Sequence, residues 1–243
     1  MKAVLSTPQL AVFDDVLPTE ELALLWRYVR SEDYVFVNRG RWEKVYGLLD
    51  GRILEGRGVA SHPRGDLDGV ASYPTGRAID LIVRLLIDHA DRFAPWIGRF
   101  AESWDCLTAR PFLYPQGSAL SWHDDGEGRV GAFSFYAHPY WNSQWGGELC
   151  VAEESTRHLH YPAEEVMGRG RVPVGMEIDN SYESAQLLEA GVGTYIMPKP
   201  NRLVVQAAGY LHRVTRVDAS AGAAVRASIS GFFMRRQAPG AAA

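Results

Sequence analysis

Trp122-His123-Asp124-Asp125-Gly126 is the stretch on which the fold of this 243-residue chain is centred, just ahead of a strand-like run from 129 to 136. His123 and Asp125 are two residues apart, so in extended backbone their side chains leave the same face and can reach one ion together. Two histidines and one carboxylate make the facial triad of non-haem Fe(II) sites, which leaves coordination positions open. We expect His212 to supply the third ligand.

The sequence around His212 predicts three successive strands, at 201–206, 209–217 and 224–233, separated by Ala and Gly turns. His212 opens the second strand and Arg226 lies inside the third. A guanidinium within an apolar strand needs an anionic partner, because burying it unpaired is costly. A dicarboxylic acid fits that need, since arginine pairs with a carboxylate through two parallel hydrogen bonds. The alternative is a partly exposed ion pair with Asp or Glu.

Several short motifs follow one another in a fixed order between about residues 108 and 233: Tyr114-Pro115-Gln116-Gly117, His123-x-Asp125, Arg129 with Tyr136, Gly146-Gly147-Glu148-Leu149, His212, and Arg226-x-Ser228. This order resembles the Fe(II)/2-oxoglutarate-dependent oxygenases, and among them the prolyl-4-hydroxylase-like branch. The chain departs from that pattern at Leu120, where many relatives carry a pocket tyrosine, and at Ala137-His138 after the strand. An extra segment also lengthens the gap before His212.

The resemblance implies a site in which His123, Asp125 and His212 hold Fe(II) and are the catalytic residues. It implies 2-oxoglutarate as cosubstrate, with Arg226 pairing its far carboxylate and Tyr136 assisting that arginine. Tyr114 and Ser228 are the further candidates for the wall of the cosubstrate pocket. The implied reaction uses O2 to hydroxylate an unactivated C–H bond, with succinate and CO2 as coproducts.

The substrate expected from the tryptophan-rich surroundings is a small molecule, such as an amino acid or a natural-product intermediate. Trp122, Trp141 and Trp145 either clamp it or belong to the core, and both interpretations stay open. A peptidyl-prolyl or protein hydroxylase is the alternative enzyme. A non-catalytic barrel that binds a metal or ligand, as a sensor or scaffold, is the alternative from another class.

The composition indicates which binding partners and which cellular location to expect for this protein. A net charge of −4 and an isoelectric point near 6.0 give no basic footprint, so we expect no nucleic acid partner. Cys106 and Cys150 are too few for a disulfide framework and indicate buried thiols in a reducing cytoplasm. No apolar run is long enough for a membrane span, so we expect a cytoplasmic protein. A homodimer is compatible with the sequence.

The predicted fold class is mainly β with flanking helices (α+β). Thr19 is expected to cap a helix of about three turns, and Thr75 a second helix that ends at Pro95 and packs outside a sheet. Strands follow from 104 onward, which suggests an antiparallel double-layered barrel. The family resemblance implies a double-stranded β-helix, a jelly-roll or cupin-like barrel buttressed by the N-terminal helices.

We expect one oxygenase domain over 1–236, with N-terminal support from helices and strands in 1–102, the barrel core in 103–236 and a flexible tail at 237–243. Residues 38–74 are expected to be surface loop rather than pocket lining, and 153–192 an inserted lid-like segment. His158 and His160 are interpreted as surface histidines, and His138 as a strand-end histidine hydrogen-bonded to backbone.

Overall fold

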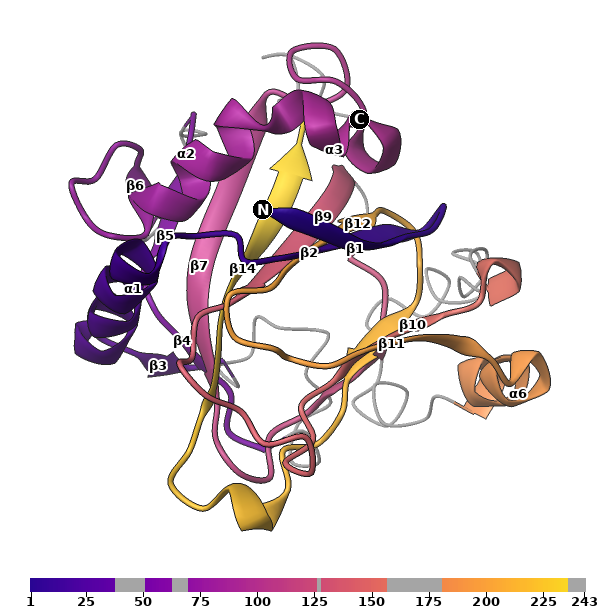
Figure 1. The fold of residues 1–243 in the computed structure, drawn as a ribbon. Helices are drawn as coiled ribbons and strands as arrows, with labels where there is room; N and C mark the ends of the chain where they lie inside the picture. Colours follow the sequence, from indigo (N-terminus) through magenta and orange to yellow (C-terminus); the bar gives the residue numbers. More distant parts are fainter. Residues whose placement is uncertain (38–50, 63–69, 126–127, 157–180, 236–243) are drawn as a thin grey trace, which may run out of the picture.

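The computed structural model describes residues 1–37, 51–62, 70–125, 128–156 and 181–235 (Figure 1). Its helices are α1 (Thr19–Ser31), α2 (Asp80–Asp88), α3 (Ala90–Ile97) and α6 (Ser181–Ala190), with short 3-10 helices at Glu154–Thr156 and Ala219–Ala221. Its strands are β1 (Lys2–Ser6), β2 (Leu10–Asp14), β3 (Val35–Phe36), β4 (Leu54–Glu55), β5 (Gly58–Ala60), β6 (Val70–Ser72), β7 (Cys106–Tyr114), β8 (Leu120–His123), β9 (Arg129–Tyr136), β10 (Leu149–Ala152), β11 (Gly193–Ile196), β12 (Leu203–Ala207), β13 (His212–Val214) and β14 (Arg226–Met234).

Within these ranges the strands form two sheets. The large sheet has ten strands in the order β1-β2-β12-β9-β14-β7-β4-β3, with β5 beside β7 and β6 beside β5. The small sheet has four, in the order β11-β10-β13-β8. Apart from β5 with β6, the strand pairs of both sheets are antiparallel. The two sheets make a double-stranded β-helix, so the predicted fold class is confirmed.

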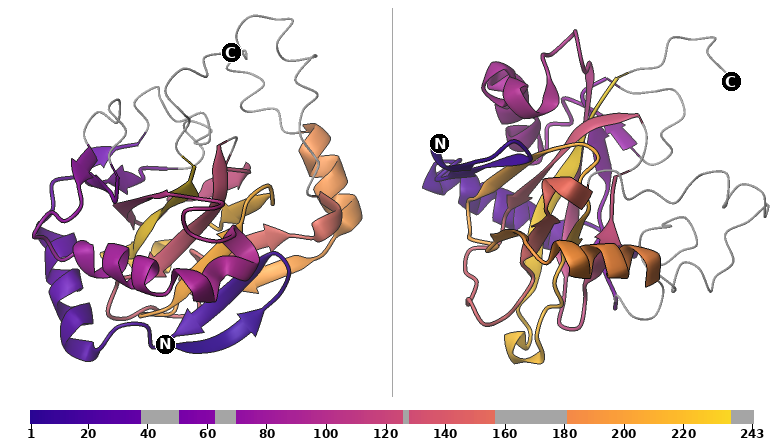
Figure 2. Two further views of the ribbon diagram at one scale, coloured as in Figure 1. Left: turned by 90° about the horizontal axis from the view of Figure 1, so that it is seen from above. Right: turned by 90° about the vertical axis from the view of Figure 1, so that its right-hand side faces the viewer.

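Successive side chains of β14 point to opposite faces of the large sheet. Ala227, Ile229 and Phe233 leave one face and join the main hydrophobic core, which α2 and α3 cover (Figures 1 and 2). Burial of each large apolar side chain there stabilises the fold by roughly 2–3 kcal/mol. Arg226 and Ser228 leave the opposite face, into the barrel. The strand that builds the core therefore also carries polar groups toward the site.

The first helix forms where the sequence predicts one, but its cap residue is different. Pro18 is the N-cap residue, with extended backbone (φ −57°, ψ 153°), and its carbonyl accepts the Leu22 N–H at 3.0 Å. Thr19 is already helical, so its prediction as the N-cap is wrong. Pro18 stays extended and lacks an N–H of its own, which suits the position before a helix. The helix therefore starts at Thr19, one residue earlier than a threonine cap would place it.

The second predicted helix is two helices. The carboxylate of Asp80 accepts the N–H groups of Thr75 and Gly76 at 2.7 and 2.8 Å, which folds residues 75–79 into a turn and delays the start of α2 to Asp80. The prediction of Thr75 as the cap is therefore wrong. Pro95 does not end the helix either, because the break falls at His89 and Pro95 lies inside α3. In an eight-residue helix a late proline removes only one helical hydrogen bond.

The expectation of an irregular loop over 38–74 is wrong where this segment is described. β4 and β5 both pair with β7, and β6 pairs in parallel with β5. These strands have only two or three residues, too few to show an alternating pattern in the sequence. Residues 38–50 and 63–69 lie outside the described residues.

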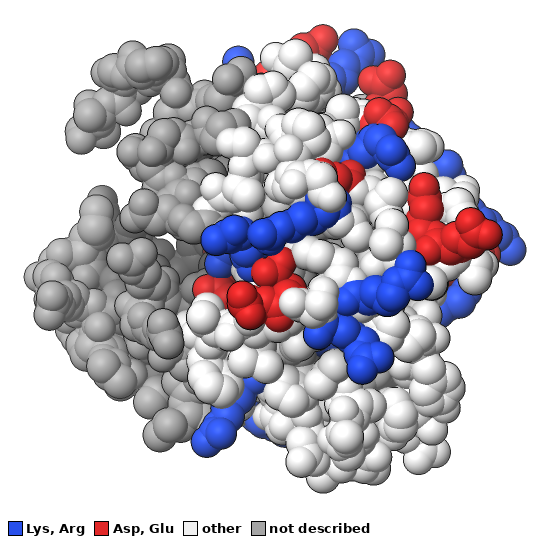
Figure 3. All heavy atoms as spheres, turned by 90° about the vertical axis from the view of Figure 1, so that its left-hand side faces the viewer, with Lys and Arg blue, Asp and Glu red and all other residues white. Residues whose placement is uncertain are grey.

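The side of the molecule where α1 lies carries basic and acidic side chains interspersed with one another (Figure 3). Two ion pairs join the region of α1 to that of α2, Arg77–Glu32 at 3.2 Å and Arg84–Glu21 at 3.5 Å. Exposed pairs of this kind contribute at most about 1 kcal/mol. Of the helices described, none combines the length and apolar character that crossing a bilayer requires.

Candidate active site

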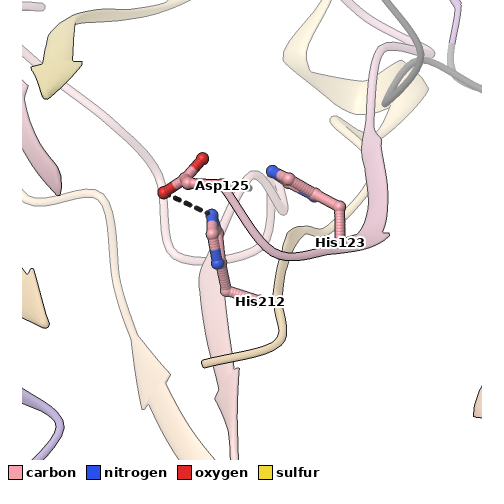
Figure 4. A group of neighbouring side chains, drawn as sticks. All are labelled: His123, Asp125 and His212. Carbon is pink, nitrogen blue, oxygen red and sulfur yellow. Dashed lines mark ion pairs between the residues drawn. The ribbon is translucent and has the colours of Figure 1, made fainter. Parts of the chain in front are cut away.

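The predicted triad comes together at the inner face of the small sheet. His123 is the last residue of β8 and His212 the first of β13, and the two are direct partners across these antiparallel strands. Asp125 follows β8 by two residues, and its carboxylate turns toward the ring of His212 (Figure 4). Residues 89 positions apart therefore meet because two neighbouring strands hold them in register.

The three side chains have the spacing of a metal site. Their ligand atoms all lie within 4.8 Å of one another. The imidazole centroids are 4.3 Å apart, and the Asp125 Oδ2 lies 3.7 Å from the His212 Nε2. Each residue is under a tenth exposed. Two imidazoles and one carboxylate at this spacing could hold a divalent ion such as Fe(II).

The hydrogen bonds of the two histidines favour the same ring nitrogen for a metal. The His123 Nδ1 lies 2.6 Å from the Ser121 carbonyl oxygen, and the His212 Nδ1 lies 2.9 Å from the Tyr210 carbonyl oxygen. In both cases the acceptor is two residues earlier in the chain. An Nδ1–H that donates to a carbonyl leaves the Nε2 lone pair free for a cation. His123 and His212 could therefore both bind one ion through Nε2.

Arg226 lies in the barrel interior with only 2% of its surface exposed. Its guanidinium sits between the rings of Tyr114 and Tyr136, 4.8 and 4.9 Å from their centroids, and its Nε donates to the Gly147 carbonyl at 2.6 Å. No carboxylate within the described ranges pairs with it. The surface ion pair considered from the sequence is therefore not what these residues show.

The Tyr136 hydroxyl is a second buried polar group in this part of the barrel. It is fully buried and makes no hydrogen bond to any described residue. Burial raises the pKa of this hydroxyl, although the neighbouring Arg226 opposes part of the effect, so Tyr136 remains a neutral donor. A buried guanidinium beside an unpaired hydroxyl suits one carboxylate of a dicarboxylic acid.

The other two candidates for the cosubstrate pocket lie beside these groups. Tyr114 is the strand partner of Arg226 and is 5% exposed. Ser228 is the strand partner of Tyr136 and is 1% exposed. The four residues predicted for cosubstrate binding thus share one place in the large sheet.

Gly147 lies beside the candidate site, in a contact that the sequence did not reveal. Gly146 and Gly147 precede β10, and both have positive φ, 69° and 75°. A Cβ on Gly147 would lie only 2.7 Å from the Arg226 Cδ. The missing side chain therefore makes room for the arginine, a contact between parts of the chain 79 residues apart.

Gln206 is the second position that the sequence analysis missed. It is 5% exposed on β12, and its side-chain amide nitrogen lies 3.1 Å from the His212 Nδ1. The available signal was a glutamine within the apolar run from Leu203 to Ala207.

His138 is held by the backbone, as predicted, and is separate from the triad. Its Nδ1 accepts the Ala227 N–H at 3.2 Å and its Nε2 donates to the Pro198 carbonyl at 2.8 Å. Burial lowers its pKa to about 4, and Arg226 adds to the effect. His138 is therefore a neutral structural link at neutral pH.

The tryptophans near the site divide into two groups. Trp141 and Trp145 pack 5.2 Å apart against a core cluster that contains Tyr114 and Leu120. Trp122 instead lies under the Arg213 guanidinium, whose Cζ is 5.1 Å from the centroid of the tryptophan ring. The core interpretation therefore holds for Trp141 and Trp145. His158 and His160 lie outside the described residues.

Comparison with known proteins gives one family match, to the 2OG-Fe(II) oxygenase superfamily over residues 110–234, just over half of the chain. A search of curated proteins finds no match. Among solved structures, a Pseudomonas putida prolyl-4-hydroxylase is similar with a TM-score of 0.57 and 16% identity, covering 93% of both chains.

Two further structures have the same fold. A Trichoplax adhaerens prolyl hydroxylase, solved with a peptide fragment of the hypoxia inducible factor oxygen degradation domain, gives a TM-score of 0.57 and 18% identity over 94% of this chain and 84% of that one. HygX from Streptomyces hygroscopicus, with nickel and 2-oxoglutarate bound, gives 0.52 and 12% identity over 96% and 88%.

Proposed function

Because the chain belongs to the 2OG-Fe(II) oxygenase superfamily, we propose that it hydroxylates an unactivated C–H bond of a small molecule, such as an amino acid or a natural-product intermediate. The protein is a 2-oxoglutarate-dependent dioxygenase and hence an oxidoreductase. It uses Fe(II), 2-oxoglutarate and O2. Succinate and CO2 would be the coproducts of the hydroxylation.

We assign the iron site to His123, Asp125 and His212. The observation that carries this assignment is their convergence, with ligand atoms within 4.8 Å and each residue under a tenth exposed. When bound there, Fe(II) would supply the oxidative chemistry. The protein residues would contribute a fixed ligand geometry in surroundings from which most water is excluded.

We assign the far carboxylate of 2-oxoglutarate to Arg226, with the Tyr136 hydroxyl as a second donor. The burial of both groups and their lack of a described acidic partner support this assignment. Tyr114 would hold the guanidinium plane from one side, and Ser228 would line the pocket beside Tyr136. Fixing the cosubstrate at its far end orients its reacting end toward the triad.

A small substrate is supported by the low exposure of all three candidate ligands, which lie within the barrel rather than on an open surface. We expect a compact molecule to reach such a site more readily than an extended peptide. The Trichoplax adhaerens relative was solved with a peptide, so proline-containing peptides belong in the test.

The test is a measurement of succinate formation from 2-oxoglutarate in the presence of Fe(II), with panels of free amino acids, small cyclic metabolites and proline-containing peptides. We expect at least one small molecule to stimulate succinate formation and to gain one oxygen atom by mass spectrometry. Stimulation by peptides alone would establish the protein hydroxylase instead. Binding of iron and 2-oxoglutarate without turnover of any compound would favour a sensor or scaffold.

The domain organisation stays a prediction from the sequence. We propose one domain over 1–236, in which 153–192 is an insertion that includes α6, and residues 157–180 and 236–243 lie outside those described. A cytoplasmic location, the lack of a nucleic acid partner and a homodimer stay predictions.

A further inference from the structure

Gln206 places a buried amide against a candidate iron ligand. It lies on β12 of the large sheet, opposite Leu10 on β2 and Ala132 on β9. Its side chain reaches across the barrel to the small sheet, where the amide nitrogen lies 3.1 Å from the His212 Nδ1. A residue of one sheet thus contacts a ligand held by the other.

A polar side chain at this place is costly unless it is hydrogen-bonded. The surrounding cluster is apolar and includes Leu10, Val151 and Val204, with Ala207 packed against it. An unpaired buried amide costs about 1–3 kcal/mol, whereas a hydrogen-bonded one contributes to stability. The contact with His212 is therefore the feature that accounts for a glutamine here.

The chemistry of the ring decides which end of the amide must face it. The His212 Nδ1 also lies 2.9 Å from the Tyr210 carbonyl oxygen, which can only accept. Nδ1 must then carry the proton, and this leaves Nε2 free to bind a cation beside Asp125. An amide nitrogen cannot donate to an Nδ1–H, but a half-turn of the amide group presents its oxygen instead.

Resting on the iron site proposed above, we propose that Gln206 is a positioning residue, which accepts a hydrogen bond from the His212 Nδ1–H through its Oε1. Together with the Tyr210 carbonyl it fixes the plane of the ring and aims Nε2 at the ion. Tyr210 is itself anchored, because its hydroxyl donates to Glu154 at 2.5 Å. Acceptors behind a metal-binding histidine raise its basicity and hold its orientation.

The test compares Gln206→Met, whose thioether sulfur is only a weak acceptor, with Gln206→Glu, which can accept but cannot donate. Gln9→Met is the matched control, because Gln9 is also buried, at 7% exposure, and donates to the Ala152 carbonyl rather than to a histidine. Metal affinity is measured anaerobically by titration with Fe(II), and in parallel with Co(II), whose visible absorption reports on the ligand field. Circular dichroism verifies that each variant is folded.

We expect Gln206→Met to weaken binding of either metal by about 10- to 100-fold. Gln206→Glu should bind at least as tightly as the wild type and shift the Co(II) absorption, while Gln9→Met should match the wild type. Wild-type affinity in Gln206→Met would overturn the inference. If that variant does not fold, weaker binding by Gln206→Glu would overturn it, because the amide would then be acting as a donor. A wild-type protein that binds neither metal would instead refute the iron site itself.

Discussion

Arg226 is a buried cation held by two aromatic rings and one backbone carbonyl, and within the described residues it has no carboxylate partner. Replacing it with alanine should lower the affinity for 2-oxoglutarate about 100-fold, which corresponds to about 3 kcal/mol. The affinity of Arg226→Lys for 2-oxoglutarate should lie between that of the wild type and that of Arg226→Ala, because an ammonium keeps the charge but not the two-point geometry. Isothermal titration of the iron-loaded variants measures this, and equal affinities would contradict the assignment.

Asp125 and its neighbour Asp124 provide a matched pair for the metal site. Asp125→Ala should abolish retention of iron, because loss of a direct ligand costs more than the roughly 10- to 100-fold cost of losing a supporting residue. Asp124 is not in the cluster of potential ligands, so Asp124→Ala should retain the metal. Metal analysis after gel filtration under anaerobic conditions distinguishes the two. Equal iron contents would contradict the role of Asp125.

Among individual residues, the sequence predicts those that belong to motifs in or next to strand-like runs. His123 and Asp125 follow from their spacing, and the strand pattern placed His212 and Arg226 correctly. The contacts of Gly147 with Arg226 and of Gln206 with His212 could not be predicted, because they join separate strands through packing. The Thr19 and Thr75 caps were wrong because neighbouring residues, Pro18 and Asp80, control the turns there.

Among the elements, the turn before β10 sets the position of Arg226. Gly147 and Gly117 both have positive φ, 75° and 81°, so an alanine at either should cost roughly 1–2 kcal/mol of stability. Only at Gly147 would the new Cβ meet Arg226, since nothing lies within 4 Å of one at Gly117. Gly147→Ala should therefore also weaken 2-oxoglutarate binding about tenfold, or about 1.4 kcal/mol. If Gly117→Ala bound 2-oxoglutarate as weakly as Gly147→Ala, backbone strain alone would account for the loss of affinity.

The elements that the sequence predicts best are the long strands with clear alternation. β9 was predicted with its observed bounds, and β7 and β14 within about two residues. β4, β5 and β6 were missed because they are held by pairing with β7 and its neighbour rather than by a pattern of their own. The break between α2 and α3 was missed because its signal, a change of backbone angles at His89, leaves no mark in residue type.

For the whole molecule, His138 links the end of β9 to β14 and to the chain at Pro198, and its pKa is lowered to about 4 from 6.5. The unfolded chain therefore binds more protons than the folded one between these values. The contribution of His138 is complete above pH 6.5 and falls by roughly 3 kcal/mol as the pH drops to 4.

Chemical denaturation at several pH values measures this effect. His138→Gln, which can keep a donor and an acceptor but cannot titrate in this range, should show a correspondingly weaker pH dependence. His89→Gln, at an exposed position, is the control and should behave as the wild type does. An unchanged slope in His138→Gln would contradict the buried neutral histidine.

The architecture of the whole molecule was predictable because two independent patterns agree. The alternating strands after residue 103 indicate a layered β barrel, and the order of motifs places its site between the layers. Strands from residues 1–102 also enter the large sheet, as β2 beside β12 and β4 beside β7 show. The support expected from this part of the chain combined helices with strands, and its strands extend the large sheet itself.

The most direct measurement of the central claim is an anaerobic titration of the metal-free protein with Fe(II) and then 2-oxoglutarate, monitored by visible absorption. If His123, Asp125 and His212 hold iron and Arg226 holds the far end of the cosubstrate, a charge-transfer band should appear on adding 2-oxoglutarate. His212→Ala should lose this band, and Arg226→Ala should need about 100-fold more 2-oxoglutarate to reach it. A band of unchanged intensity and midpoint in both variants would contradict the assigned site.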